Sequence, residues 1–218
     1  MRIKKLERFA QNKKSKNVIE PGKELYETIA GNWKNYFGDE HDLVVELGCG
    51  WGEYTTALAE KFPKKKFIGV DIKGDRVWRG SQYAQKNELS NVAFLRCHII
   101  EISNLFDEDE VDELWLTFPD PQPKDRNEKH RLSNSTFLEK YQHILKPRGF
   151  FRFKTDDTFL FEYTLRVLSN FEIKDFEFTY DLYHSNLLDD HFGIKTKYEK
   201  LWIKQGKKIK YMKFRFNA

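Results

Sequence analysis

The chain has 218 residues, enough for one domain with a sizeable core, and its 39% of hydrophobic and 33% of charged residues exclude a disordered protein. No apolar run approaches the roughly 20 residues of a membrane-spanning helix, so no membrane partner is expected. Two cysteines are too few for a disulfide scaffold, and the charged N-terminus lacks the apolar stretch of a signal peptide, so we expect a cytoplasmic protein.

The net charge of +4 hides a concentration of basic residues at both ends of the chain. Residues 1–16 contain seven Lys or Arg and one acid, and residues 195–218 contain nine Lys or Arg and one acid. Such segments attract polyanions, nucleic acid above all, although either run alone is equally consistent with a solvated tail. We expect residues 1–20 to form a mobile basic N-terminal arm and residues 21–218 to form a single domain.

The segment from residue 42 to residue 170 alternates short apolar runs with stretches of helical spacing. Strands that alternate with helices indicate a parallel sheet covered on both faces, with ligands at the carboxyl ends of the strands. Strands are predicted at residues 42–47, 66–72, 91–97, 111–118 and 149–155, and helices at 54–62, 75–89, 133–145 and 157–170.

The pattern changes after residue 170. Residues 171–183 and 208–216 alternate apolar and polar side chains, as half-buried antiparallel strands do. The expected fold is therefore α/β and Rossmann-like, with a mostly parallel sheet of seven strands that finishes in a C-terminal antiparallel hairpin.

A glycine turn follows the first predicted strand. Gly48, Gly50 and Gly52 stand between this strand and the next helix, where glycine lets the backbone approach a ligand closely. A dinucleotide-binding pattern would need a further glycine where the chain has Glu53, and this argues against a nicotinamide oxidoreductase. A glycine turn alone is a weak signal, so the neighbouring acids must decide the ligand.

Two acids frame this turn. Glu46 precedes it inside the strand end, where a carboxylate suits a cationic amine better than a pyrophosphate. Asp71 ends the second strand, 21 residues after Gly50, where an acid can accept from both hydroxyls of a ribose. With Gly48 and Gly50, these acids resemble the S-adenosylmethionine site of the Rossmann-like methyltransferases. His98, at the end of the third strand, would face the adenine, although a structural role fits it equally well.

The stretch "LTFPDPQPKDRNEKHRL" leaves the fourth predicted strand with Asp120 between Pro119 and Pro121. Prolines restrict the backbone, so this loop would hold the Asp120 carboxylate in one position at the ligand edge of the sheet. A plain proline turn with an exposed aspartate is the alternative interpretation. The basic residues that follow would face a polyanion.

This stretch resembles the FPDPW-x-K-x-RH-x-KRR signature of the tRNA (guanine-N7-)-methyltransferases. The resemblance covers nearly the whole chain, since "ELGCGWGEY", "FIGVDI", "LSNVAFL", "GFFRFKTDD" and "TKYEK" occur in the family's order. It implies an S-adenosylmethionine-dependent enzyme that methylates N7 of a guanine in the variable loop of tRNA. It also implies a monomer or homodimer, with no obligatory protein partner and no metal.

The resemblance gives each matching residue a role, and the chain departs from the family's pattern at Gln122, which replaces the usual Trp, and at His98, which replaces an acid. Cofactor contacts are implied for Glu46, Gly48, Gly50, Asp71, His98 and Asp120, and Asp120 is also the implied catalytic acid. Substrate contacts are implied for Lys124, Asp156, Thr196, Lys197, Tyr198 and Glu199, and RNA contacts for Arg126, Lys129 and Arg131.

Methylation of guanine N7 needs no general base, because N7 carries a lone pair and no proton. Asp120, Asp156 and Glu199 would instead accept from guanine N1–H and N2–H₂ and stabilise the positive charge that develops. Two alternatives stay open. One is a methyltransferase for an exocyclic amine, which would typically carry an aromatic residue after the prolines. The other is a binding protein that kept the fold but lost catalysis.

Overall fold

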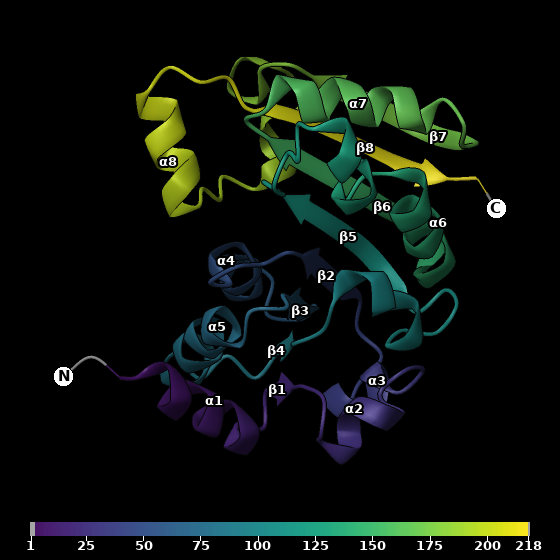
Figure 1. Cartoon of the computed structure of the whole chain (residues 1–218). Coiled ribbons are helices and arrows are strands. Elements are labelled where there is room, and N and C mark those ends of the chain that lie inside the picture. The colour runs from purple at the N-terminus through teal and green to yellow at the C-terminus, as the bar shows by residue number, and fades with distance from the viewer. Residues whose placement is uncertain (1–2, 218) are drawn as a thin grey trace.

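One twisted sheet of eight strands runs through the molecule, with helices against both of its faces (Figure 1). The computed structural model describes residues 3–217. The strands are β1 (Val18–Ile19), β2 (Leu43–Leu47), β3 (Lys66–Val70), β4 (Val92–Leu95), β5 (Val111–Thr117), β6 (Leu145–Thr155), β7 (Ile173–Thr179) and β8 (Lys210–Phe216). The helices are α1 (Lys5–Lys14), α2 (Glu24–Thr28), α3 (Trp33–Phe37), α4 (Glu53–Lys61), α5 (Gly74–Lys86), α6 (Ser135–Ile144), α7 (Thr158–Leu168) and α8 (Lys197–Lys204). Short 3-10 helices occur at η1 (Ile99–Asn104), η2 (Asp125–His130), η3 (Leu182–His184) and η4 (Leu188–His191).

The strand order places a topological switch point in the middle of the sheet. The order is β1-β4-β3-β2-β5-β6-β8-β7, in which β1 to β6 run parallel and β8 pairs antiparallel with both β6 and β7. From β2 the chain moves outward through β3 and β4, then returns to β5 on the other side. Open α/β sheets bind ligands at the carboxyl ends of the strands where the order reverses. The site is therefore expected beyond β2 and β5.

The predicted α/β class and the mostly parallel sheet are confirmed, but the strand count of seven is wrong. β1 adds an eighth strand, only two residues long, beside β4. The two C-terminal strands are antiparallel as predicted, although β8 lies between β6 and β7 and a long connection, residues 180–209, replaces a tight hairpin turn. β6 also starts earlier than predicted, directly after α6, with an irregular register against β5.

The described part of the expected N-terminal arm packs against the domain instead of being mobile. α1 lies along α5, where the buried Asn12 amide donates to the Gly74 carbonyl at 2.7 Å (Figure 1). Glycine at residue 74 leaves room for this contact, because a Cβ there would lie 2.4 Å from the Phe9 ring and would force that ring to move. Residues 1, 2 and 218 lie outside the described residues, and the division of the chain at residue 20 stays a prediction.

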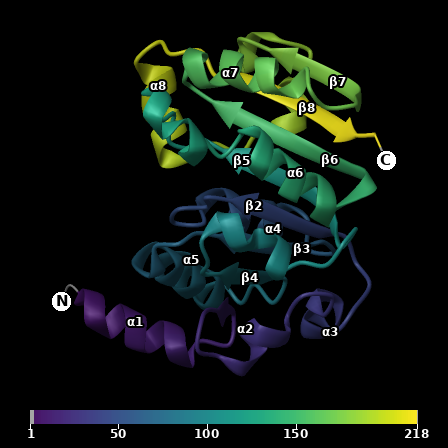
Figure 2. The ribbon, with the colours of Figure 1, turned by 45° about the vertical axis from the view of Figure 1, so that its right-hand side comes forward.

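Side chains alternate between two hydrophobic cores, one on each face of the sheet. Val45 and Leu47 of β2 join the core formed with α3, α6 and α7, and the latter two lie on the same side (Figure 2). Val44 joins the other core, with α4 and α5. Glu46 alternates with Leu47 and so points toward α4. Within residues 3–217, no helix is both long and apolar enough to cross a membrane.

Candidate active site

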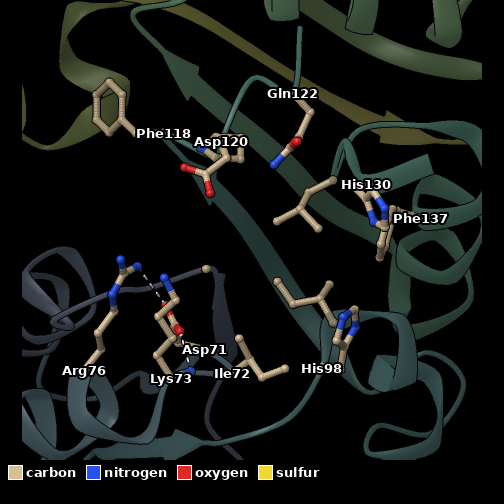
Figure 3. A pocket seen from close by; sticks show the side chains of 14 residues that line it. Asp71, Ile72, Lys73, Arg76, His98, Phe118, Asp120, Gln122, His130 and Phe137 are labelled. Atoms are coloured by element: carbon tan, nitrogen blue, oxygen red, sulfur yellow. Dashed lines mark hydrogen bonds and ion pairs between the residues drawn. The ribbon is translucent and has the colours of Figure 1, made fainter. Parts of the chain in front are cut away.

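Two adjoining hollows lie at the carboxyl ends of the parallel strands. The first, about 320 Å³, contains Asp71 and His98 (Figure 3). The second, about 460 Å³, contains Glu46 and Asp156. Both are lined by Gly48, Arg76, Phe118, Pro119 and Asp120. Asp120 is therefore on the wall that the two hollows share, and its side chain is exposed.

The glycine turn has a backbone that other residues would rarely adopt. Gly48, Gly50 and Gly52 have φ angles of 71°, 56° and 71°, in the left-handed region where glycine carries no steric penalty. A Cβ at residue 52 would also lie 2.6 Å from the Phe94 ring. Gly48 lines both hollows and Gly50 lines the second. The turn thus brings bare backbone to the edge of the site.

Asp71 is held by the glycine turn and by α5. It is 6% exposed and accepts from Gly50 N at 3.0 Å and from Lys73 N at 2.8 Å, while the Arg76 guanidinium lies 3.8 Å away. Burial raises the pKa of this carboxyl, and the two backbone donors and Arg76 oppose that shift. A carboxylate offers about four acceptor positions, so Asp71 keeps capacity for hydroxyl donors in the first hollow (Figure 3).

Glu46 is a buried carboxylate at the floor of the second hollow. It is 3% exposed and accepts from Thr55 N at 2.9 Å and from the hydroxyls of Thr55 and Thr117. Burial raises its pKa to about 7, and the threonine donors oppose the shift. A cationic group placed in this hollow would favour the charged form of Glu46.

The loop after β5 contains two strained positions. Phe118 and Gln122 have φ angles of 50° and 48°, which are uncommon for residues other than glycine. The Gln122 carbonyl accepts from the Arg131 guanidinium at 3.0 Å, and its side chain accepts from Asn127 at 3.3 Å. Gln122 thus fixes the loop by hydrogen bonds, and together with Asp120 and His130 it lines the first hollow (Figure 3).

The prediction that Arg131 contacts RNA is contradicted by its position. Arg131 is 3% exposed, and its guanidinium lies 4.4 Å and 4.8 Å from the ring centroids of Tyr163 and Phe159. Its guanidinium donates a hydrogen bond to the carbonyl of Gln122, so Arg131 stabilises the proline loop from inside the protein. The predicted RNA contacts Arg126 and Lys129 are exposed on η2.

His98, for which the resemblance implies a cofactor contact, lines the first hollow and also accepts a hydrogen bond from the backbone. Its Nδ1 accepts from Ile100 N at 3.4 Å at the start of η1. His98 therefore both caps η1 and lines the first hollow. Lys124, which precedes η2, is exposed and lines neither hollow.

The remaining predicted substrate residues come from the end of β6 and the start of α8. Asp156, Thr196 and Tyr198 line the second hollow, where Tyr198 is 55% exposed and Asp156 pairs with Lys207 at 2.6 Å. Lys197 lines neither hollow, and its backbone N–H donates to the Glu53 carboxylate at 2.7 Å.

Glu199 does not face a hollow, so the prediction that it accepts from a guanine is at odds with the structure. Its side chain is fully buried against the ammonium of Lys154, 2.8 Å away. The Tyr183 hydroxyl donates to the same carboxylate at 2.6 Å. Burial lowers the pKa of Lys154, and the neighbouring Glu199 charge opposes this shift.

An aromatic wall lines the second hollow, and only one of its four residues, Tyr198, is a predicted substrate contact. It consists of Trp51, Phe118, Tyr198 and Trp202. The Trp202 ring lies 4.9 Å from the Phe118 ring and 6.0 Å from the Tyr198 ring, measured between centroids. Trp51 and Phe118 stand inside quoted motifs and could have been included, whereas Trp202 has no local signal.

The two hollows fit a ligand that carries a ribose and a cationic group. Asp71 offers a carboxylate to hydroxyls, Glu46 offers one to a cation, and the glycine turn allows a close approach. S-adenosylmethionine has a ribose, an amino group and a sulfonium, so these residues fit it. Among residues 3–217, no three His, Cys, Asp or Glu side chains are arranged to hold a metal ion.

Comparison with solved structures gives the same fold. An antibiotic-related methyltransferase matches with a TM-score of 0.59 at 20% identity, covering 84% of this chain and 90% of that chain. The 16S rRNA methyltransferase KamB matches with a TM-score of 0.63 at 13% identity, covering 86% of this chain and 94% of that chain. At these identities the likeness shows the fold alone.

Sequence comparison shows the family as well as the fold. A family model described as "Putative methyltransferase" matches residues 40–212. A relative from Cytophaga hutchinsonii named tRNA (guanine-N(7)-)-methyltransferase is 44% identical over 218 residues, covering 99% of both chains. A protein of the same name from Christiangramia forsetii is also 44% identical, covering 97% of both. The chain belongs to the tRNA (guanine-N(7)-)-methyltransferase family.

Proposed function

We propose that this protein transfers the methyl group of S-adenosylmethionine to N7 of a guanine in the variable loop of tRNA. The observation that carries the proposal is the position of Asp120, on the wall shared by the two hollows. A cofactor that extends across both hollows and a base in the second would meet beside it. We expect a cytoplasmic enzyme that is a monomer or homodimer without an obligatory protein partner.

The cofactor would lie along the glycine turn. Asp71 would accept from the ribose hydroxyls, and His98 would flank the adenine in the first hollow. Glu46, with Gly48 and Gly50, would hold the amino group in the second hollow. When bound, S-adenosylmethionine supplies an electrophilic methyl group on a sulfonium. Asp120, at the boundary, would then face both the cofactor and the incoming base.

The guanine would enter the second hollow along the aromatic wall. Stacking of one base on an aromatic side chain contributes about 1–3 kcal/mol. Tyr198 and Trp202 offer adjacent rings with an interplanar angle of 29°. Asp156 and Thr196 line the same hollow, and Lys124 and Lys197 lie outside it as further substrate contacts.

Catalysis would depend on orientation and electrostatics rather than on a base. Guanine N7 has no proton to remove, so holding N7 in line with the methyl group supplies most of the rate. Asp120 and Asp156 would accept from guanine N1–H and N2–H₂ and stabilise the developing positive charge. Adenine has neither donor, so it could not make these hydrogen bonds and would be bound less well.

The RNA backbone would lie across basic groups on two sides of the hollows. Lys124, Arg126 and Lys129 are exposed beside the proline loop. On the other side, Lys4 and Lys5 at the start of α1 line a shallow cavity with Asp75, which also borders the second hollow. Phosphate contacts of this kind make affinity fall steeply with salt.

The proposal is tested by methyl transfer from labelled S-adenosylmethionine to unmodified tRNA, followed by chemical cleavage at N7-methylguanine. We expect cleavage in the variable loop, and turnover about 100-fold lower for Asp120→Asn and Asp120→Ala. Label at an exocyclic amine, cleavage in another loop, or near-wild-type turnover of both variants would contradict it.

A further inference from the structure

α8 is attached to the rest of the molecule in an unusual way. It lies apart from the other helices (Figure 1), and Glu199 is the one buried side chain among its eight residues. A helix this short is marginal on its own. Trp202 and Ile203 of α8 are partly buried against the core, as the apolar stripe is in most helices, but the most deeply buried side chain of α8 is a carboxylate.

The partner of this carboxylate is an ammonium from the sheet. Lys154 Nζ lies 2.8 Å and 3.1 Å from the two oxygens of Glu199, and both side chains are fully buried. The Lys154 ammonium also lies 5.1 Å from the Tyr54 ring centroid and 5.6 Å from that of Phe118. Burying two charges costs desolvation energy that their attraction rarely exceeds, so stability alone is a weak explanation for the pair.

The pair connects two walls of the second hollow. Glu199 Oε2 accepts from Thr196 N at 3.4 Å, and Glu199 N donates to the Thr196 hydroxyl at 3.2 Å, forming a capping box. Thr196 and Tyr198 line the hollow on this side. On the other side, the Lys154 carbonyl accepts from Phe118 N at 2.8 Å, at the start of the proline loop. One residue of β6 therefore contacts both α8 and the loop that carries Asp120.

We propose that Lys154 is a positioning residue, which holds the first turn of α8 against the second hollow through its ion pair with Glu199. Loss of the pair would free α8 and separate Tyr198 and Trp202 from the wall formed by Phe118. The inference rests on the proposed function for the identity of the base that enters the hollow, but the attachment of α8 is independent of it.

The test compares two double variants. Lys154→Met/Glu199→Gln removes both charges, so that neither is left buried without a partner. The control, Arg152→Met/Glu113→Gln, removes another largely buried ion pair, 3.0 Å long, which joins β6 to β5 and whose residues line neither hollow. For each protein we would measure the melting temperature, amide hydrogen exchange of residues 197–204, the dissociation constant of S-adenosylmethionine, and kcat and KM with tRNA.

For Lys154→Met/Glu199→Gln we expect a melting temperature within about 4 °C of wild type. The amides of α8 should exchange about tenfold faster or more. kcat/KM for tRNA should fall about tenfold or more, with cofactor affinity within about threefold of wild type. The control should leave α8 exchange and kcat/KM within about threefold of wild type.

Unchanged exchange of α8 in Lys154→Met/Glu199→Gln would overturn the inference, as would an equal loss of kcat/KM in the control. Failure of the proposed function is a separate outcome, because wild-type protein would then transfer no methyl group to tRNA. Hydrogen exchange needs no substrate, so it would still decide whether Lys154 holds α8.

Discussion

Glu46 is a buried carboxyl whose proposed role in cofactor binding would come at the expense of stability. Its carboxylate is buried, and its pKa of about 7 means that the folded protein binds a proton there more readily than the unfolded chain, whose ordinary value is 4.5. Between these values the folded state holds more protons than the unfolded state, so this group makes stability fall as pH rises. Above about pH 7 the full cost of the buried charge is present.

Replacement of Glu46 by Gln should therefore stabilise the ligand-free protein at high pH. At pH 8 we expect a free energy of unfolding about 1–3 kcal/mol higher than that of wild type, with a smaller difference at pH 5.5. The same substitution should weaken S-adenosylmethionine binding, because the amino group loses its anion. Urea denaturation at both pH values and calorimetry measure the two effects. A less stable variant at pH 8 would show that the buried charge is already compensated.

At the level of single elements, α1 is the clearest difference between expectation and structure. Its lysines suggested a mobile arm, but Asn12 on its inner face is fully buried and donates to Gly74 of α5. The contacts that dock α1 are polar or come from the half-buried Phe9 ring, so they leave no apolar stripe for sequence reasoning to detect.

Asn12→Ala tests this packing directly. It should lower the free energy of unfolding by about 1–2 kcal/mol, because it leaves the Gly74 carbonyl without its donor. Lys13→Ala, on the exposed side of the same helix, should change stability by less than about 0.5 kcal/mol. Urea denaturation compares them, and two equally neutral substitutions would mean that α1 is not packed in solution.

The position of Trp202 in the second hollow depends on α8, the helix to which it belongs. Trp202→Ala should raise KM for tRNA about tenfold by removing a stacking surface, whereas Trp202→Phe should retain most of the affinity. The dissociation constant of S-adenosylmethionine should stay within about twofold, since Trp202 packs against Phe118 and Tyr198 and lies outside the first hollow, where the ribose and adenine would bind. Weaker binding of S-adenosylmethionine with an unchanged KM for tRNA would show that the base binds elsewhere.

The parts of the fold that could be predicted are those with a local signal. Runs such as residues 42–47 and 66–72 are apolar and β-branched, so β2 and β3 follow from composition. β1 has only two residues, too few for an alternating pattern of apolar and polar side chains, and it forms by pairing with the free edge of β4. The site residues that could be predicted also have a local signal. Glu46 and Asp71 are predicted from their spacing around the glycine turn, and each lines one of the hollows.

The misassigned site residues are those whose orientation depends on distant partners. Arg131 is basic and follows a basic segment, but Tyr163 and Phe159 of α7 draw its guanidinium inward. Glu199 is itself a predicted substrate contact, but Lys154, 45 positions earlier, fixes it in the interior. A side chain's partner across the fold cannot be deduced from its own neighbours in the sequence.

At the scale of the whole molecule, the sheet gathers acids from segments far apart in the chain at one edge. Glu46 ends β2, Asp120 follows β5 and Asp156 follows β6, and all three line the second hollow. The switch point between β2 and β5 creates the space between them. We propose that this arrangement holds the cofactor and the guanine beside Asp120, with N7 facing the methyl group, and this is the central claim of the mechanism.

That claim is tested most directly with a tRNA whose variable-loop guanine is replaced by 7-deazaguanine. This base keeps N1–H and N2–H₂ but has a carbon in place of N7, so it should bind and accept no methyl group. We expect no label in the 7-deaza tRNA, and competitive inhibition of the unmodified tRNA with an inhibition constant within about threefold of its KM. Methyl incorporation into the 7-deaza tRNA at a rate comparable to the normal substrate would contradict the account.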